Sequence, residues 1–355
     1  MTYETQDREA YLSNFKQCKQ AYSGLGIAVI VLFFVYMVGS YALMYATDYL
    51  LPDLYGQWWF QWVLNLVPLY CLALPAFYLC LRRVDKGRHD PTYVSYGLIY
   101  EKPRFHLGHF CLFAVVAFGL MYMGSLVGNG LMSWMSQKLN YDYQNGLNDL
   151  AATSPWWMLL LGSVIIAPIG EEFIFRKLFI DRARRYGDGM AILLSALLFA
   201  LFHGNFFQFF YAFLVGGLMA YLYTLTGKLY WSAGLHMFMN FMGMMVIPKL
   251  TSLLGMEELN AIDPNDIEAM EAYMMSHMGA YIGLALFSLL IYGAMIASVV
   301  IIIYHIRKKK IYLGAGETPL RPEDRGLAAF GNKGIAICIL LLCLLMAMNL
   351  IPVPQ

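Results

Sequence analysis

A series of long apolar runs constrains this chain more than any other feature of its sequence. Runs of roughly 18 or more mostly apolar residues are long enough to cross a bilayer as helices. Seven such runs are present, and two further runs are separated only by Gly204 and Asn205. The sequence therefore predicts an all-α polytopic membrane protein with about nine transmembrane helices. They lie near residues 25–47, 58–80, 106–128, 156–175, 189–203, 206–227, 231–248, 279–304 and 334–352.

The composition supports this fold class and argues against others. Of the 355 residues, 60% are hydrophobic and only 13% are charged, which is typical of integral membrane proteins rather than soluble ones. The six cysteines show neither CxxC nor Cys/His spacing, so they are expected to be core residues rather than disulfides or zinc ligands. The basic residues lie in short loops and form no extended patch, so no nucleic-acid partner is expected.

The lysines and arginines are distributed unequally between the predicted connections. If the nine spans alternate and the N-terminus is cytoplasmic, 22 of the 24 Lys and Arg residues fall on the cytoplasmic side. Only Lys138 and Lys249 fall on the other side. Because cytoplasmic connections carry the excess of basic residues, this pattern predicts a cytoplasmic N-terminus and an outside C-terminus. The polar N-terminal segment does not resemble a cleavable signal, so the first span is expected to be retained.

The predicted spans divide the chain into three parts. Residues 1–155 hold a cytoplasmic tail and three spans, residues 156–248 hold four spans, and residues 249–355 hold an acidic outside loop and two spans. The middle part carries charged and polar residues inside its apolar runs. Such residues are costly within a bilayer and mark functional sites, so the middle part is expected to be the catalytic core.

The stretch IGEEFIFR at 169–176 places three charges beside an apolar run. Glu172 and Arg176 are four residues apart on one helix face, in the favourable order for an ion pair. Glu171 lies about 100° around the helix from Glu172. Glu172 and Arg176 are therefore expected to pair and to support the architecture, which leaves Glu171 free for chemistry.

Two other predicted spans carry polar side chains with helical spacing. Phe199 and His203 are four residues apart, and so are His236 and Asn240. Each pair therefore projects from one face of its helix. Residues 171 and 203 are equidistant from the turn at Gly187, and His236 enters from the same side of the membrane. The polar side chains are thus predicted to converge at one depth, nearer the cytoplasm.

These residue types fit the hydrolysis of a peptide bond. A carboxylate and an imidazole, here Glu171 and His203, can share the deprotonation of a water molecule. A second histidine with an asparagine, here His236 and Asn240, can donate hydrogen bonds to the oxyanion. A zinc site formed by Glu171, His203 and His236 is an alternative. The zinc site is less favoured because the chain has no HExxH motif and no further carboxylate is evident to serve as the base. The sequence therefore favours no cofactor, and zinc stays possible.

The three motifs together resemble those of the CPBP family of intramembrane proteases, which includes the CAAX prenyl proteases and the bacteriocin-immunity-type Abi proteins. They are Glu-Glu-x-x-x-Arg, Phe-x-x-x-His and His-x-x-x-Asn, in this order on successive spans. The resemblance covers about a quarter of the chain. It implies that Glu171 and His203 activate the water, that His236 and Asn240 form the oxyanion site, and that Glu172, Arg176 and Phe199 support them. A glutamate protease is favoured over a metalloprotease.

The expected substrate is a membrane-associated peptide or protein, and the expected environment is a lipid bilayer. The chain is expected in a plasma membrane, with a bacterial one favoured. Two other classes of function stay open. One is a catalytically silent scaffold, regulator or bacteriocin-immunity protein on the same fold, and the other is a transporter that uses the polar cluster as a proton relay. The sequence shows no inverted repeat, which counts against the transporter.

Overall fold

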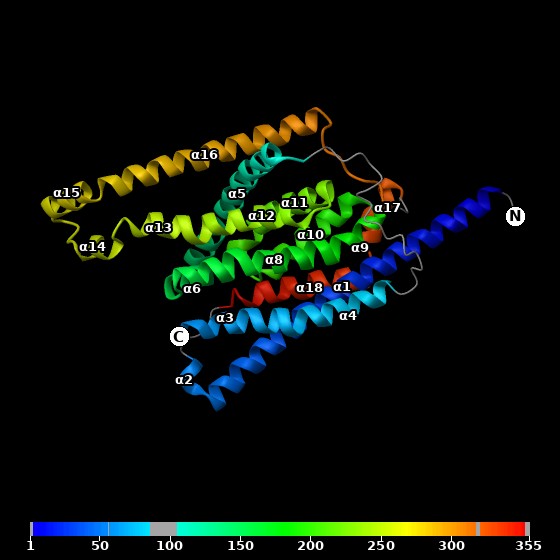
Figure 1. Cartoon of the computed structure of the whole chain (residues 1–355), viewed down its shortest axis with the longest axis horizontal. Helices are drawn as coiled ribbons and strands as arrows, with labels where there is room; N and C mark the ends of the chain where they lie inside the picture. The colour runs from blue at the N-terminus through cyan, green and yellow to red at the C-terminus, as the bar shows by residue number, and fades with distance from the viewer. Residues whose placement is uncertain (1–2, 56, 86–104, 317–319, 352–355) are drawn as a thin grey trace.

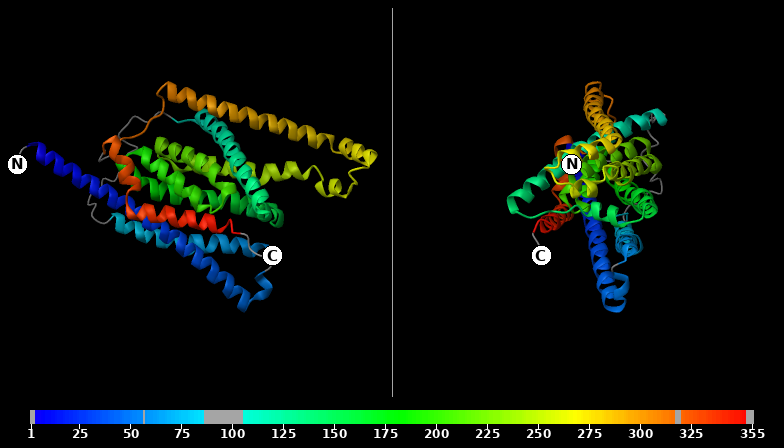
Figure 2. Two further views of the ribbon diagram at one scale, coloured as in Figure 1. Left: turned by 180° about the vertical axis from the view of Figure 1, so that it is seen from behind. Right: turned by 90° about the vertical axis from the view of Figure 1, so that its left-hand side faces the viewer.

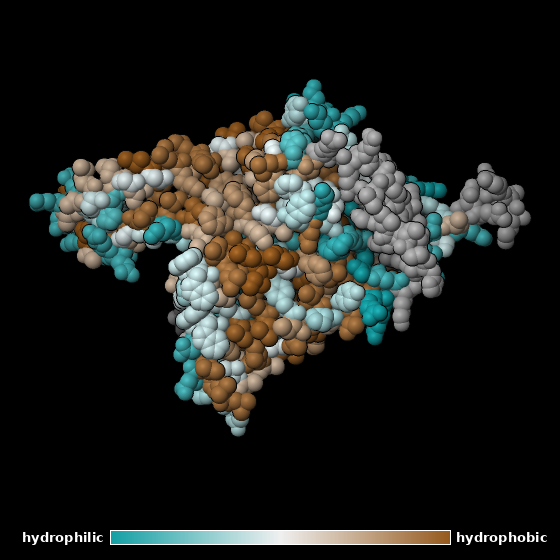
Figure 3. Space-filling model, in the orientation of Figure 1, coloured by the Kyte–Doolittle hydropathy of each residue, from teal (hydrophilic) through white to brown (hydrophobic). Residues whose placement is uncertain are grey.

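The computed structural model describes residues 3–55, 57–85, 105–316 and 320–351, and every regular element in these ranges is a helix (Figure 1). This confirms the predicted all-α class. Six helical segments are long and apolar enough to cross a membrane. A broad hydrophobic surface covers the middle of the molecule, and hydrophilic residues gather toward its two ends (Figure 3). The described chain is therefore that of a multi-pass membrane protein.

The six long apolar segments coincide with six of the nine predicted spans. Four of them are single helices: α1 (Tyr3–Leu50), α5 (Leu107–Leu139), α11 (Phe206–Thr226) and α16 (Met278–Arg307). The segment Trp58–Asp85 consists of α3 (Trp58–Val67), η1 (Pro68–Ala73) and α4 (Leu74–Asp85). The segment Trp156–Tyr186 consists of α7 (Trp156–Leu159), η3 (Leu160–Ile166), α8 (Ala167–Glu172), η4 (Phe173–Ile180), α9 (Asp181–Ala183) and η5 (Arg184–Tyr186).

The other three predicted spans are less regular. α17 (Pro322–Phe330) and α18 (Lys333–Met348) form a seventh span only if this pair, bent by 60°, is counted as one. α10 (Asp188–Phe202) has 15 residues and is shorter than a full crossing requires. The run 231–248 falls in α12 (Leu229–Phe241), η6 (Met242–Val246) and α13 (Ile247–Ser252), where His236 and Asn240 reduce the apolar character. The described helices thus support six or seven spans, and the count of nine, the orientation and the three-part division stay predictions.

The helices form an elongated bundle (Figures 1 and 2). α8, α10, α11 and α12 occupy its centre, α1 and α4 flank them on one side, and α5 and α16 flank them on the other. α18 packs between α1 and α10. The N-terminus, α9 and α17 lie toward one end of the bundle, and the C-terminus and α6 lie toward the other (Figure 1). The remaining short helices are α2 (Pro52–Tyr55), α6 (Gly146–Thr153), α14 (Met256–Ala261) and α15 (Ile267–Ser276).

Two glycines let α5 lie directly against α11. A Cβ added at Gly124 would stand 2.4 Å from the Tyr211 Cα, and one added at Gly128 would stand 2.7 Å from the Phe206 carbonyl oxygen. Small residues spaced four apart allow such close approach between membrane helices. α11 is therefore fixed against a long apolar helix, which holds the bend between α10 and α11 in place.

The predicted break at Gly204 and Asn205 is confirmed. α10 ends at Phe202 and α11 begins at Phe206. Gly204 has a φ of +69°, a left-handed conformation that glycine adopts without steric cost. Asn205 caps α11, because its Oδ1 accepts a hydrogen bond of 2.9 Å from the Gln208 backbone N–H. The bend follows His203, which caps the end of α10 and is partly buried.

Candidate active site

Glu172 and Arg176 form a fully buried ion pair. The Arg176 Nε donates to Glu172 Oε2 over 3.0 Å, and both side chains are 0% exposed. The pairing predicted from their spacing is therefore confirmed. Breaking a buried pair by removing one partner strands the other charge in a low-dielectric interior. These two side chains thus neutralise each other's charge inside the bundle.

Arg176 also fixes the neighbouring helix. Its Nη1 donates to the Ser195 hydroxyl on α10 over 2.7 Å, and that hydroxyl donates to the Phe175 carbonyl over 3.1 Å. The guanidinium carbon stands 5.0 Å from the centre of the Phe199 ring, in cation–π contact. Ser195, Phe199 and His203 follow one another at intervals of four residues on α10. The buried arginine therefore sets the rotation of the helix that carries His203.

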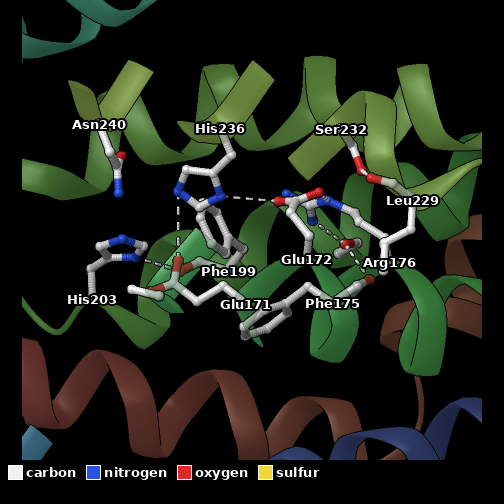
Figure 4. Close-up of polar contacts among 12 residues, drawn as sticks. Glu171, Glu172, Phe175, Arg176, Phe199, His203, Leu229, Ser232, His236 and Asn240 are labelled. Carbon is white, nitrogen blue, oxygen red and sulfur yellow. Dashed lines mark hydrogen bonds and ion pairs between the residues drawn. The ribbon is translucent and has the colours of Figure 1, made fainter. Parts of the chain in front are cut away.

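His236 contacts both glutamates. Its Nδ1 lies 3.2 Å from Glu172 Oε1, and its Nε2 lies 3.7 Å from Glu171 Oε2. The predicted convergence of Glu171 with His236 is therefore confirmed, because the α12 helix brings the imidazole between the two carboxylates (Figure 4). The spacing along one helix could not reveal this contact, since it joins residues on different helices.

Glu171 and Glu172 differ in their access to solvent. Glu172 is completely enclosed, whereas the Glu171 side chain keeps 18% of its exposure. Glu171 also lacks the arginine partner that neutralises Glu172. Of the two adjacent glutamates, Glu171 is the one that a water molecule and a substrate can reach.

His203 is oriented by its own helix. Its Nδ1 lies 2.8 Å from the Phe199 carbonyl oxygen. A carbonyl oxygen can only accept, so Nδ1 carries the proton and Nε2 of the neutral ring is the basic nitrogen. Among the described residues no hydrogen bond joins His203 to Glu171 directly. The two side chains nevertheless lie on the same side of the site in Figure 4, and the basic nitrogen of His203 is not occupied by that carbonyl.

Asn240 is held by the helix opposite its own. Its Nδ2 donates to the Ser163 carbonyl in η3 over 2.8 Å. An amide nitrogen has two protons, so one donor remains after this bond. Figure 4 shows the amide pointing toward the same region as His203 and His236. The predicted convergence of side chains from α8, α10 and α12 is therefore seen in their arrangement.

The Phe199 ring packs against both histidines of the site. Its ring centre lies 4.8 Å from that of His203 and 5.7 Å from that of His236, in edge-on arrangements. It also lies against Gly216, where an added Cβ would stand 2.8 Å from the Phe199 ring. One ring thus supports both imidazoles and the guanidinium of Arg176.

Three tyrosines near Glu171 could not be identified from the sequence. Tyr36 of α1, Tyr70 of η1 and Tyr211 of α11 are close enough to interact with the Glu171 charge. Tyr70 packs on the backbone itself, since a Cβ added at Gly170 would stand 2.1 Å from its ring. These three are among 26 tyrosines, and no spacing distinguishes them. Ser195, by contrast, could have been found, because it extends the face of Phe199 and His203 by one turn.

The positions of Glu171, His203 and His236 bear on the zinc alternative. Among the residues that the structure describes, no three His, Cys, Asp or Glu side chains are grouped so that they could hold a metal ion. Glu171 and His236 approach each other, and the bond from His203 Nδ1 to a backbone carbonyl leaves Nε2 as the ring nitrogen of His203 that could bind a metal. The three candidate ligands therefore do not form a preassembled set among the described residues.

Comparison with known proteins matches part of the chain to a family model. Residues 153–242 match the family model described as type II CAAX prenyl endopeptidase Rce1-like. No curated protein matches the chain, and no solved structure matches it. The matched segment contains the glutamate pair, Phe199, both site histidines and Asn240. The resemblance to the CAAX protease family that the three motifs indicate is therefore confirmed over this segment.

Proposed function

We propose that this chain, whose residues 153–242 belong to the Rce1-like type II CAAX prenyl endopeptidase family, cleaves membrane-associated peptides or proteins within the bilayer. Members of that family are glutamate-type intramembrane proteases. The reaction is the hydrolysis of a peptide bond, with water as the nucleophile. The observation that carries the proposal is the contrast between the two glutamates. One is neutralised and enclosed, and the other stays partly exposed beside His236, on the same side of the site as His203 (Figure 4).

In the proposed mechanism Glu171 and His203 activate the water. The Glu171 carboxylate or the His203 Nε2 accepts one proton as the water oxygen attacks the substrate carbonyl. The same proton is then given to the leaving amine, so the site returns to its starting state. The bond from His203 Nδ1 to the Phe199 carbonyl supports this role, because it fixes the tautomer in which Nε2 is free to accept.

His236 and Asn240 are proposed to stabilise the oxyanion. The His236 Nδ1 lies against Glu172 and its Nε2 faces Glu171, so we propose that an N–H at Nε2 turns from Glu171 to the developing negative charge during the reaction. Asn240 contributes the amide proton that Ser163 does not use. Donors fixed before the reaction need no reorganisation, and the loss of one typically costs about 10²- to 10³-fold in rate.

The proposal is tested with the purified full-length chain in lipid nanodiscs. Two panels of internally quenched peptides are incubated with it, one with a prenylated cysteine near the C-terminus and one of unmodified membrane-spanning sequences, and products are identified by mass spectrometry. Wild type is compared with Glu171→Gln and His203→Ala. His305→Ala is the matched control, because its Nδ1 also lies 2.8 Å from the carbonyl four residues earlier but outside the site.

We expect the wild type and His305→Ala to cleave at least one panel, and Glu171→Gln and His203→Ala to lose cleavage. Which panel is cleaved identifies the substrate class. A wild type that cleaves neither panel, or site variants that cleave as fast as wild type, would refute the protease and favour the catalytically silent scaffold. The chain is a multi-pass membrane protein, and we propose the bacterial plasma membrane as its location.

A further inference from the structure

Asn349, the residue that caps the end of α18, contacts the bend that follows His203. The Asn349 Nδ2 donates to the Gly204 carbonyl oxygen over 2.8 Å, although the two residues are 145 positions apart in the chain. α18 lies outside the segment that matches the protease family. A residue from outside the matched segment therefore reaches the backbone next to a proposed catalytic histidine.

α18 is held rigidly enough to act as a fixed support. It buries a stripe of side chains at helical spacing, formed by Ile335, Cys338, Leu342 and Met346. At its other end the Gly334 N–H donates to the Ser23 hydroxyl of α1 over 3.0 Å. A Cβ added at Gly334 would stand 1.9 Å from the Ser23 carbonyl oxygen, so the two helices are in backbone contact there. Asn349 is thus carried by a helix that is anchored along its length.

Two side chains hold the two consecutive carbonyls of the bend. The Asn205 Nδ2 donates to the His203 carbonyl over 2.9 Å, and the Asn349 Nδ2 donates to the next carbonyl, that of Gly204. Helices end with unsatisfied carbonyl groups, and these two bonds satisfy two of them. Gly204 is in the left-handed conformation and has no side chain, and its carbonyl is held by a residue from outside the bend.

A hydrogen bond from the segment between α5 and α6 also holds the chain just after α18. The Tyr143 hydroxyl, in the segment between α5 and α6, donates to the Leu350 carbonyl over 2.6 Å. Leu350 follows Asn349 directly. The neighbouring Tyr141 packs on the Tyr143 ring, but its hydroxyl makes no hydrogen bond among the described residues. Tyr143 therefore anchors the end of α18, and Tyr141 offers a matched comparison.

We propose that Asn349 is a positioning residue for His203, and that α18 holds the bend at Gly204 in the conformation that the reaction requires. This role rests on the proposed proteolytic function. Asn349 acts through the backbone and touches neither substrate nor water. Displacement of a catalytic group by about 1 Å can cost up to 10²-fold in rate without changing substrate binding. Loss of the bond should thus lower kcat and leave KM nearly unchanged.

The test uses the full chain in nanodiscs with a peptide that the wild type cleaves. Asn349→Asp keeps the shape and removes the donor, and Asn349→Gln keeps the donor. Asn265→Ala is the control, because that amide bonds only to nearby Asp263. We expect Asn349→Asp to lower kcat by about 5- to 20-fold with KM within about twofold, and Asn349→Gln to recover much of the loss. Tyr143→Phe should have a smaller effect of the same kind, and Tyr141→Phe none.

Hydrogen–deuterium exchange gives a readout that does not need activity. Asn349→Asp should speed the exchange of the amides of 203–206 and leave those of 191–196 unchanged. Unchanged exchange, or a normal kcat despite faster exchange, would overturn the positioning role. A KM effect as large as the kcat effect would overturn it too. If the wild type cleaves no peptide, the proteolytic function fails and the positioning role fails with it, whereas cleavage by wild type confines any failure to the role of Asn349.

Discussion

Removal of Arg176 tests the buried ion pair on which the site is built. Arg176→Met leaves a side chain of similar length in an apolar setting but strands the Glu172 carboxylate, which is 0% exposed. Breaking a buried pair from one side typically costs about 3–5 kcal/mol. The single variant also loses the hydrogen bond to Ser195. We therefore expect unfolding free energy to fall by about 4 kcal/mol or more.

A double variant measures the coupling energy between Glu172 and Arg176. Glu172→Gln removes the stranded charge and keeps an oxygen that can accept from His236. Arg176→Met with Glu172→Gln should therefore be more stable than the sum of the single effects predicts, with a coupling of about 2 kcal/mol or more. Lys177 and Asp181 provide the control cycle. They are also four residues apart and 2.7 Å from each other, but Lys177 is 49% exposed, so their coupling should stay below about 1 kcal/mol.

The assay is reversible unfolding of the full chain in mixed micelles with increasing SDS, followed by circular dichroism. Each variant is measured at the same lipid and detergent ratio, so that the unfolded reference state is shared. Equal couplings in the two cycles, or purely additive effects of Arg176→Met and Glu172→Gln, would refute the reasoning. Such a result would mean that the pair is not enclosed as its geometry indicates.

The other predictions concern packing and metal dependence. Phe199→Leu removes the ring on which His203 rests, so cleavage should fall by about tenfold while stability falls by about 1 kcal/mol, and equal cleavage rates would contradict the role of the ring. Gly170→Ala should cost about 1–3 kcal/mol in thermal unfolding, because the added Cβ meets the Tyr70 ring at 2.1 Å. Gly217→Ala, with 3.7 Å to its nearest neighbour, should cost nothing. Treatment with 1,10-phenanthroline should leave cleavage within about twofold, and loss of activity that added zinc restores would contradict a metal-free site.

The local part of the site could be predicted from helical spacing. The Glu172–Arg176 bond follows from a separation of four residues, and the break at Gly204 follows from two short polar or flexible residues between apolar runs. Both features depend only on neighbours in the chain. The order of the three motifs along the chain also predicted the family match.

The contacts between helices could not be predicted in the same way. Placement of His236 between both glutamates depends on how far α12 rotates and slides against α8, which no spacing within either helix specifies. The bond of Asn349 to Gly204 joins two residues that share no motif. The count of spans shows the same limit, because α10 is short and α17 bends against α18, whereas hydropathy registers only apolar length.

The single-turnover cleavage rate of Glu171→Gln, measured beside Glu172→Gln, tests most directly whether the two glutamates have separate functions. Glu171 is proposed to act on water, and Glu172 is bound to Arg176 and His236. We predict that Glu171→Gln loses at least about 10²-fold in rate with an unchanged Tm, because general base catalysis contributes about 10²- to 10⁴-fold. Glu172→Gln should instead lower the Tm. A Glu171→Gln protein that folds as stably as wild type and cleaves at the wild-type rate would contradict the account.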